Sequence, residues 1–421
     1  KVEDILNEYV LTEETMEKIK LTIEEQMKFA NSKDEETRKK SDLFWECTYV
    51  TGLMSGKENG QYLGLDLGGT NFRVVGTVFT NGKADIKTKY YNLPTELFTG
   101  PCSGIFDHIA ESIEKFIKEE NISSDTSIPI GFSFSFPSIQ KSLKHSVLVT
   151  WTKSFKCPDG LGQDPVVMLE EAIHRRGGLS VPVDVIARIS DTTGTLMAGN
   201  YLDHNCRIGL ILGSGSNACF VEKVEKYNKL ETDIGSDKVV VNTEWGALGD
   251  NGCLDFIKTE LDKELDLNSN HVHSFSFEKL FSGLYLGELV RLVLLKLTKD
   301  GCLFDGQTTD NLQKPYFFTT DFVSDIESER IVRVLEKLEL DTVATADDIA
   351  IIRKTCAILS QRGAYVVAIA LAVLLKHMNL PEVTIGIDGS LYEFHPKYHD
   401  HILDVLTKLV KDTKVTNAYY A

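Results

Sequence analysis

Short stretches in which apolar and polar positions alternate are the first pattern along this chain, and they predict strands. "LGLDL" and "FRVVGTVF" follow one another between residues 63 and 79, and "IPIGFSFSF" follows at 128–136. The second and third are rich in β-branched or aromatic residues. In the third, Phe132, Phe134 and Phe136 fall on one face of the expected strand.

Apolar positions near a 3.6-residue period predict helices between and after these strands. The predicted helices cover residues 2–29, a stretch after Asp42, 107–118, 166–175, 278–297, 325–338 and 349–378. Strands and helices that alternate in this way indicate an α/β or α+β protein and exclude a helical bundle.

A second passage has the plan of the first hairpin. "RIGLILGSGSNACFVEKV" at 207–224 is an apolar run, a Gly-rich turn and another apolar run, like residues 62–79. The repeat predicts two halves of related topology, about 1–200 and 201–421, each with a Gly-rich turn.

Length and charge narrow the possible functions. At 421 residues the chain exceeds one typical core, which predicts two domains or more. A net charge of −17 argues against sequence-independent nucleic-acid binding, which needs a broad basic surface. The eight cysteines are scattered without a CxxC pair, which is typical of reduced thiols and not of a zinc site.

The segments most relevant to membranes do not predict a transmembrane helix. Residues 1–20 have no apolar signal core, and the longest apolar run, "AYVVAIALAVLL" at 364–375, has twelve residues. A span needs about 20, so a helix buried in a core is the better interpretation.

The first Gly-rich turn has residues that suit phosphate. Glycine lets the backbone approach a ligand and aim N–H groups at it, Asp66 could hold a hydrated Mg²⁺, and Arg73 could neutralise charge. The alternative is a plain hairpin turn in which Asn and Gly take the conformations they favour. The turn itself consists of Gly68, Gly69, Thr70 and Asn71.

The second turn, "GSGSNA" at 213–218, fits the dinucleotide pattern GxGxxG/A, but a strand follows it where that motif requires a helix. A hydride-transfer enzyme is therefore not predicted. The sequence also lacks GxxxxGK[ST], which excludes a P-loop. Phosphates would have to be held by the two hairpin turns.

Two aspartates follow apolar strands. Asp191, in "ARISDTTG", could cap the following helix or act as a general base at the carboxyl end of its strand, where α/β proteins bind ligands. "GIDGSLYE" repeats the arrangement with Asp388, Gly389 and Ser390, and it would offer another helix N-terminus to an anion.

Together these segments resemble eukaryotic hexokinases of the single-unit type. The motifs that carry the resemblance run in order from about Tyr49 to Tyr398. They are "LDLGGTNFRV", "FSFSFPSIQ", "TWTKSFK", "SDTTGT", "GSGSNACF", "NTEWGALGD", "FEKLFSGLYLGELVR" and "GIDGSLYEFHP".

The resemblance implies an α/β fold of the actin-like ATPase (ribonuclease H-like) type, with two domains and a deep cleft between them. The expected domains are a small one at 57–189 and a large one at 1–56 plus 190–421. The implied reaction moves the γ-phosphoryl group of ATP to the 6-hydroxyl of glucose or a related hexose, the first step of glycolysis, with Mg²⁺ as cofactor.

The resemblance also implies roles for individual residues. Asp191 matches the catalytic base, which would accept the proton of the 6-hydroxyl, and Lys153 is the second catalytic candidate. Asp66 would act on Mg²⁺ through bound water, beside Arg73. The sugar-binding positions are Ser138, Thr152, Lys153, Ser190, Asp191, Asn217, Glu244 and Glu278. The phosphate and nucleotide positions are Gly68, Gly69, Thr70, Asn71, Gly213, Ser214, Gly215, Asp388, Gly389 and Ser390.

The expected partners are a hexose, ATP and ADP, with glucose 6-phosphate as a candidate inhibitor and no nucleic acid. The expected location is the cytoplasm, with peripheral attachment to mitochondria as an alternative. Ser190 stands where most members of the family have Asn, which predicts weaker sugar binding or lower turnover because one hydroxyl replaces an amide. A sugar sensor without efficient transfer and an actin-like ATPase without a sugar substrate are the competing hypotheses.

Overall fold

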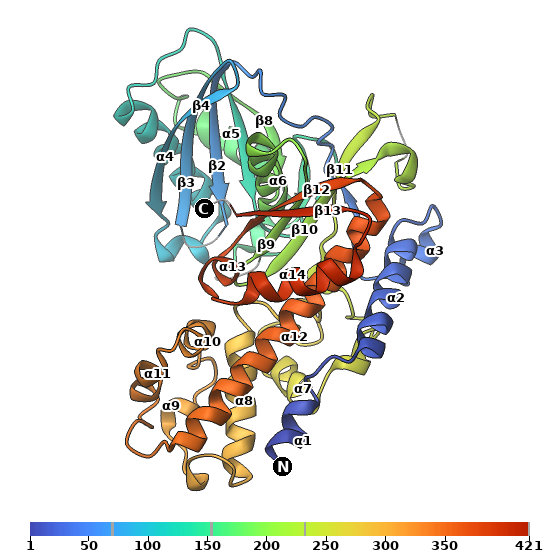
Figure 1. Cartoon of the computed structure of the whole chain (residues 1–421). Helices are drawn as coiled ribbons and strands as arrows, with labels where there is room; N and C mark the ends of the chain where they lie inside the picture. Colours follow the sequence, from blue (N-terminus) through green and yellow to red (C-terminus); the bar gives the residue numbers. More distant parts are fainter. Residues whose placement is uncertain (69–70, 152–154, 231–232, 420–421) are drawn as a thin grey trace. The chain divides into compact units, whose positions relative to one another are not determined.

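The computed structural model describes residues 1–68, 71–151, 155–230 and 233–419, and it divides the chain into two compact units (Figure 1). Unit 1 comprises Lys1–Trp45, Asn205–Glu231 and Asn242–Ala421, and unit 2 comprises Glu46–His204 and Thr232–Val241. The expected boundaries at residues 56 and 189 differ from these units, because residues 46–56, 190–204 and 232–241 group with unit 2 by their contacts.

Unit 2 is built on a five-stranded sheet in the order β4-β3-β2-β5-β8. β2 pairs with β3 antiparallel and with β5 parallel, and β5 pairs with β8 parallel. The predicted hairpin and the predicted strand at 128–136 are therefore confirmed. The strands of unit 2 are β1 (Glu46–Cys47), β2 (Gly60–Leu67), β3 (Asn71–Thr80), β4 (Lys83–Asn92), β5 (Ile128–Phe134), β6 (Ser138–Gln140), β7 (Ser146–Leu148) and β8 (Val183–Ile189).

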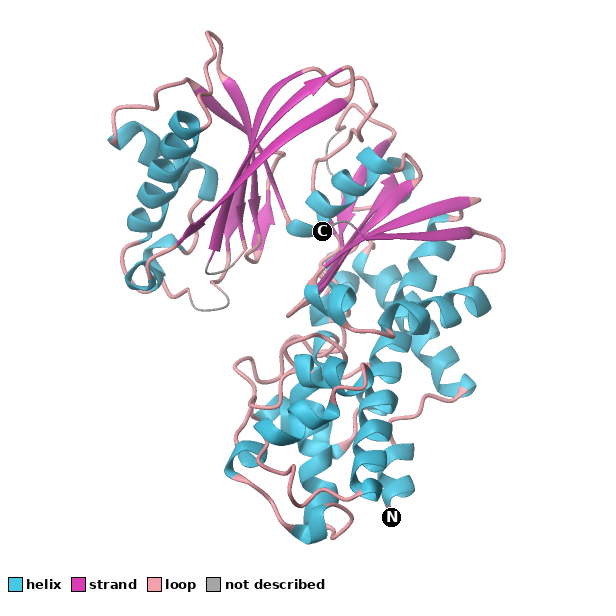
Figure 2. Ribbon diagram, turned by 60° about the vertical axis from the view of Figure 1, so that its left-hand side comes forward, coloured by secondary structure: helices cyan, strands magenta, loops and turns pink. Residues whose placement is uncertain are grey.

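Helices pack against the sheet of unit 2 (Figure 2). Helix α4 (Cys102–Glu119) packs on β3, α5 (Pro165–Arg175) packs on α4 and β8, and α6 (Asp191–Leu202) packs on β5. Phe132, Phe134 and Phe136 belong to the core, as the alternation predicted.

Unit 1 has a sheet whose strands β10, β9, β12 and β13 follow one another in that order. β9 pairs with β10 antiparallel and with β12 parallel, and β12 pairs with β13 parallel. This pairing repeats the pattern of β3, β2, β5 and β8, which confirms the predicted relation between the halves. The strands are β9 (Cys206–Leu212), β10 (Ser216–Lys223), β12 (Glu382–Asp388) and β13 (Lys414–Tyr419), and β11 (Lys238–Asn242) ends in unit 1.

The helices of unit 1 gather around one long helix, α12 (Ala346–Met378), which packs on α2, α8, α10 and α14. By length and composition α12 could cross a membrane, but 83% of its apolar window is buried inside the protein, as in a core helix. The other helices are α1 (Val2–Asn7), α2 (Glu13–Ala30), α3 (Glu35–Arg38), α7 (Glu260–Leu267), α8 (Leu286–Lys299), α9 (Asp310–Gln313), α10 (Thr320–Glu327), α11 (Ile331–Lys337), α13 (Ser390–Phe394) and α14 (Tyr398–Leu409).

Four helix predictions need correction. The helix expected over 325–338 is interrupted at residues 328–330, between the end of α10 and the start of α11. The helix expected over 2–29 is two helices, because Thr12 caps a new one by accepting a hydrogen bond from the Thr15 backbone N–H at 3.1 Å. The helix expected after Asp42 is absent from the described residues there, where the chain is extended and enters β1. The helix expected over 278–297 begins only at Leu286, after a short 3₁₀ turn, Glu278–Leu280.

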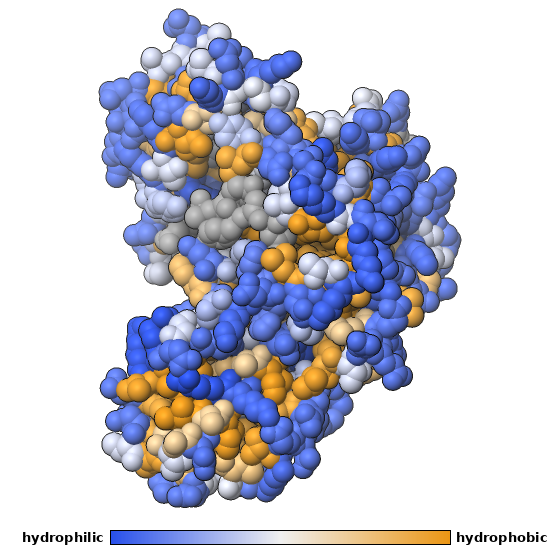
Figure 3. Space-filling view, viewed as in Figure 1, coloured by the Kyte–Doolittle hydropathy of each residue, from blue (hydrophilic) through white to orange (hydrophobic). Residues whose placement is uncertain are grey.

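The surface is mostly hydrophilic on the face drawn in Figure 3, as the composition predicts. Apolar side chains gather there over the part of unit 1 that contains α8–α11, and Val332 of α11 is 60% exposed.

Candidate active site

Glu278 is a partly buried carboxylate of unit 1 in a space that two glycines leave open. Its Oε2 accepts a hydrogen bond from the Ser216 backbone N–H at 3.1 Å. A Cβ on Gly215 would lie 3.0 Å from this oxygen, and one on Gly246 would lie 3.2 Å away. These positions must therefore lack side chains for the carboxylate to lie where it does.

The pKa of Glu278 is raised to about 7, chiefly by burial and also by the nearby charge of Glu244, against the lowering effect of the Ser216 N–H. The carboxyl is thus close to half-protonated at neutral pH. Such a group can accept or donate a hydrogen bond, which suits contact with a hydroxyl.

The backbone of Glu244 has a left-handed conformation, with φ 47° and ψ 48°, and two amide side chains bind its carboxylate. Its Oε1 accepts hydrogen bonds from Asn217 Nδ2 at 3.1 Å and from Asn242 Nδ2 at 2.6 Å. Non-glycine residues seldom adopt this conformation, and such strain concentrates at functional sites. The structure therefore brings together three predicted sugar-binding residues: Asn217, Glu244 and Glu278.

Two residues that the sequence prediction did not assign support this cluster. Asn242 is 7% exposed and also accepts a hydrogen bond from Asn217 Nδ2 at 2.9 Å. Asp250 accepts hydrogen bonds from the Phe275 and Ser276 backbone N–H groups at 3.1 and 2.8 Å, which orders the segment before Glu278. Both lie in the quoted motif "NTEWGALGD", so the motif itself was the available signal.

The predicted phosphate turn of unit 1 lies against two other backbone segments. The Gly283 N–H donates to the Gly213 carbonyl at 2.8 Å, and the Leu284 N–H donates to the Ser214 carbonyl at 3.1 Å. A Cβ on Gly389, whose φ is +125°, would lie 2.4 Å from the Leu212 carbonyl carbon and oxygen. Gly213, Ser214 and Gly215 are thus brought close to the segment Asp388, Gly389 and Ser390.

The segment predicted to bind nucleotide lies at the end of a central strand. Asp388 is the last residue of β12, opposite Ile211 of β9. Gly389 then caps α13, which starts at Ser390 and has five residues. The predicted repeat of a strand, an aspartate and a helix start is confirmed.

Asp191 is the first residue of α6 in unit 2, directly after β8. The helix cap is Ser190, whose Oγ accepts a hydrogen bond from the Thr193 N–H at 3.4 Å. The interpretation of Asp191 as the cap is therefore wrong. Its Oδ1 accepts from the Thr192 N–H at 2.8 Å, and the residue is only partly buried at the carboxyl end of its strand.

Ser138 begins β6, and a buried arginine ties this strand to β8. Arg188 Nη1 donates to Gln140 Oε1 at 2.9 Å, and Gln140 Nε2 donates to the Arg188 carbonyl at 3.2 Å. Arg188 precedes Ser190 by two residues, so this exchange holds the strand of Ser138 to β8, the strand that precedes Asp191. Arg188, which the sequence prediction did not assign, is a supporting residue.

Asp66 and Arg73 face each other across the β2–β3 hairpin. They are direct partners in the register, and Arg73 Nη2 donates to Asp66 Oδ2 at 2.9 Å. Gly68 lies in the turn and Asn71 starts β3. Four predicted residues lie outside the described residues: Gly69, Thr70, Thr152 and Lys153.

The described residues contain no group of three or more His, Cys, Asp or Glu side chains placed to hold a metal ion. Mg²⁺ does not require three such side chains, because it commonly keeps several waters and binds one or two carboxylates plus substrate phosphates. Arg73 contacts one oxygen of Asp66 and leaves the other for a hydrated cation, so the residues present fit such an ion.

Two family models, both described as hexokinase, match the chain over residues 1–201 and 207–419. The chain belongs to the hexokinase family. The solved hexokinase from Schistosoma mansoni, complexed with glucose, superposes with a TM-score of 0.90 at 34% identity, over 99% of this chain and 94% of that one. The resemblance seen in the sequence and the predicted two-domain α/β fold are thereby confirmed.

Vertebrate hexokinases are similar over most of this chain. Human hexokinase HKDC1 is 40% identical over 385 residues, which is 88% of this chain and 41% of the relative. Human hexokinase-2 is 41% identical over 377 residues, 86% of this chain and 40% of the relative. The chain therefore spans about two fifths of the length of these hexokinases.

Proposed function

We propose that this chain phosphorylates glucose or a related hexose at the 6-hydroxyl, with ATP as phosphoryl donor. The observation that carries the proposal is the cluster of Asn217, Glu244 and Glu278, whose carboxylates and amide are held in place by their neighbours. A hexose has hydroxyls on every side, and fixed acceptors and donors of this kind recognise them. Glucose in the Schistosoma mansoni structure supports the choice of sugar.

Asp191 is assigned the role of general base in this proposal. Its place at the carboxyl end of β8 is where α/β proteins bind ligands, and it is partly exposed to solvent. A carboxylate there accepts the proton of the 6-hydroxyl as the oxygen attacks the γ-phosphorus. Lys153, Thr152 and Ser138 stay predicted sugar-binding residues.

The two Gly-rich turns are assigned to the phosphates of ATP. Backbone N–H groups at Gly213–Gly215 and in the β2–β3 turn would donate to phosphate oxygens, and Arg73 would offset their charge. Asp66 would hold Mg²⁺ through water, and the ion would neutralise charge that develops on the phosphates. Glucose 6-phosphate is proposed as an inhibitor because it keeps the hydroxyls of the sugar. The cytoplasmic location stays a prediction.

The test is ADP release from ATP and Mg²⁺, with and without glucose, for the parent chain and for Asp191→Ala. We expect glucose to stimulate release strongly and the substitution to abolish the stimulation while glucose still binds. Asp125→Ala, which removes an exposed aspartate of the same unit, is the matched control and should behave as the parent. Glucose binding without stimulated release in the parent would refute the proposal and favour a sugar sensor.

A further inference from the structure

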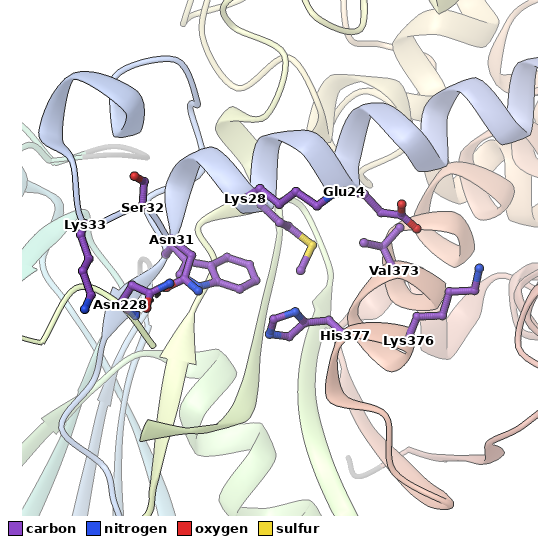
Figure 4. Close-up of a pocket in the computed structure, with 11 residues that line it drawn as sticks. Glu24, Lys28, Asn31, Ser32, Lys33, Asn228, Val373, Lys376 and His377 are labelled. Atoms are coloured by element: carbon purple, nitrogen blue, oxygen red, sulfur yellow. Dashed lines mark hydrogen bonds between the residues drawn. The ribbon is translucent and has the colours of Figure 1, made fainter. Parts of the chain in front are cut away.

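A pocket of about 590 Å³ lies in unit 1 between the ends of two helices (Figure 4). The last turn of α2 forms one wall, the last turn of α12 forms another, and Trp45 and Asn228 complete it. Its volume is within the range of sites that bind small molecules. None of its lining residues belongs to the candidate active site.

The apolar part of the pocket wall is fixed by contacts behind it. Trp45 is 1% exposed, and its ring packs against Phe220 and His377 at centroid distances of 5.0 and 6.1 Å. Its carbonyl accepts hydrogen bonds from Tyr227 Oη at 3.0 Å and Lys229 Nζ at 3.1 Å. The indole is thus rigid, and with Met27 and Val373 it gives the pocket a preformed apolar surface.

Three exposed lysines, Lys28, Lys33 and Lys376, line the same pocket. No described residue forms an ion pair with any of the three. By contrast, Lys20 and Lys354, which lie earlier on the same two helices, are each paired with a glutamate. A cluster of unpaired cations is unusual in a chain with a net charge of −17, and it attracts anions.

Helix dipoles explain only part of this cluster. Lys28 and Lys376 lie in the last turns of their helices, where cations are favoured. Lys33 lies outside any helix and still lines the pocket at the end where Asn228 lies, whereas Lys376 lies at the other end and Lys28 lies between them (Figure 4). His377 lies between the ends and contacts the buried Glu222 through Nε2.

One residue of the pocket wall also has a hydrogen-bond donor for which the described residues supply no acceptor. Trp45 Nε1 is buried and has no acceptor in the described part of the chain. A buried donor of this kind calls for an explanation, such as a bound acceptor. Glu24 is the single carboxylate among the lining residues, so the overall charge of the lining is positive.

We propose that this pocket binds a small phosphate ester with an apolar or ring-shaped body, at a site separate from the sugar and nucleotide residues. The phosphate would contact Lys28 and Lys376, and the body would lie on Met27 and the rim of Trp45. Lysine is a common point-charge ligand for phosphate, and a preformed apolar wall lowers the entropy cost of binding.

Pyridoxal 5′-phosphate is the probe, because it has a phosphate, a ring and an aldehyde. A neutral lysine amine and the aldehyde condense to an imine with loss of water, and borohydride reduces the imine to a stable secondary amine. Peptide mass spectrometry then identifies the labelled lysines. We expect Lys28, Lys33 or Lys376 to be labelled at a concentration about tenfold below that needed for Lys299, an exposed lysine elsewhere in unit 1. Inorganic phosphate should protect them.

The double variant Lys28→Gln/Lys376→Gln tests the site by calorimetry with the same probe. We expect its dissociation constant to rise about tenfold or more, because two charge-assisted contacts are lost. The control Lys20→Gln/Lys354→Gln removes the same charge from the same helices and should leave affinity unchanged.

Labelling at the rate of Lys299, no protection by phosphate, or equal affinity of the double variant and the parent would each overturn the proposal. The double variant should keep glucose-stimulated ADP release, since neither lysine belongs to the proposed active site. Failure of this proposal and failure of the proposed kinase activity are therefore separate results.

Discussion

Replacement of Glu278 by Gln should stabilise the protein above neutral pH and leave it nearly unchanged in acid. The folded protein raises the pKa of this carboxyl from an ordinary 4.5 to about 7, chiefly by burial. Below pH 4.5 the carboxyl is protonated in both the folded and the unfolded state, so it does not make the free energy of unfolding depend on pH there. Between 4.5 and 7 the folded state holds a proton that the unfolded state has lost, so the stability falls as pH rises.

The size of the effect follows from that interval. At 1.36 kcal/mol for each pH unit, the free energy of unfolding falls by about 3 kcal/mol up to pH 7 and then stays level. Because Glu278 is only partly buried, about 3 kcal/mol is an upper value. Gln keeps an oxygen that can accept a hydrogen bond from the Ser216 N–H, and it does not ionise. The free energy of unfolding of the variant therefore does not fall in this way.

The assay is urea denaturation of the parent and of Glu278→Gln at pH 5 and pH 8. We expect the stability of the variant relative to the parent to increase by 1 kcal/mol or more from pH 5 to pH 8. Glu264→Gln, which changes an exposed glutamate of α7, should show no such increase. The same relative stability of the Glu278 variant at both pH values would refute the reasoning. Glucose binding by the variant should be weaker, since a hydroxyl acceptor is lost.

Three further substitutions test the site residues. Asn242→Ala removes the 2.6 Å hydrogen bond to Glu244 and should raise the KM for glucose by about tenfold, with little change in helix content. An unchanged KM would contradict the role of Asn242 in positioning Glu244. Ser190→Asn should strengthen glucose binding or raise kcat, and unchanged kinetics would refute this expectation. The same variant should shift the free energy of unfolding by less than about 0.5 kcal/mol, because Asn caps helices as well as Ser does. Gly389→Ala should lower the free energy of unfolding by about 3 kcal/mol or more, since the new Cβ would overlap backbone atoms. Gly301→Ala, at a position with open space and φ +70°, should lower it by about 1 kcal/mol. Equal melting temperatures of the two variants would contradict this difference.

The hairpins and the relation between the two halves could be predicted from sequence because alternation and Gly-rich turns are local patterns. The break before α8 could not, because it depends on a distant segment. The Gly283 N–H donates to the Gly213 carbonyl at 2.8 Å, and a Cβ at Gly283 would lie 2.8 Å from that same oxygen. The apolar periodicity of residues 278–297 contains no information about such a long-range contact.

The site residues were predictable to different degrees for similar reasons. Motif resemblance pointed to Asn217, Glu244 and Glu278, whose cluster the structure then shows. The left-handed backbone of Glu244 and the raised pKa of Glu278 depend on packing and burial, which no local pattern encodes. Asn242 was overlooked because an asparagine at the end of a strand is ordinary until its two side-chain hydrogen bonds are known.

The close approach of Gly213, Gly283 and Gly389 has a consequence for the order in which the chain folds during synthesis. Gly213 leaves the ribosome long before the other two, so the turn between β9 and β10 cannot reach its final packing until Gly389 has also been made. If the turn binds ATP as proposed, a chain stalled before residue 389 should bind no nucleotide there.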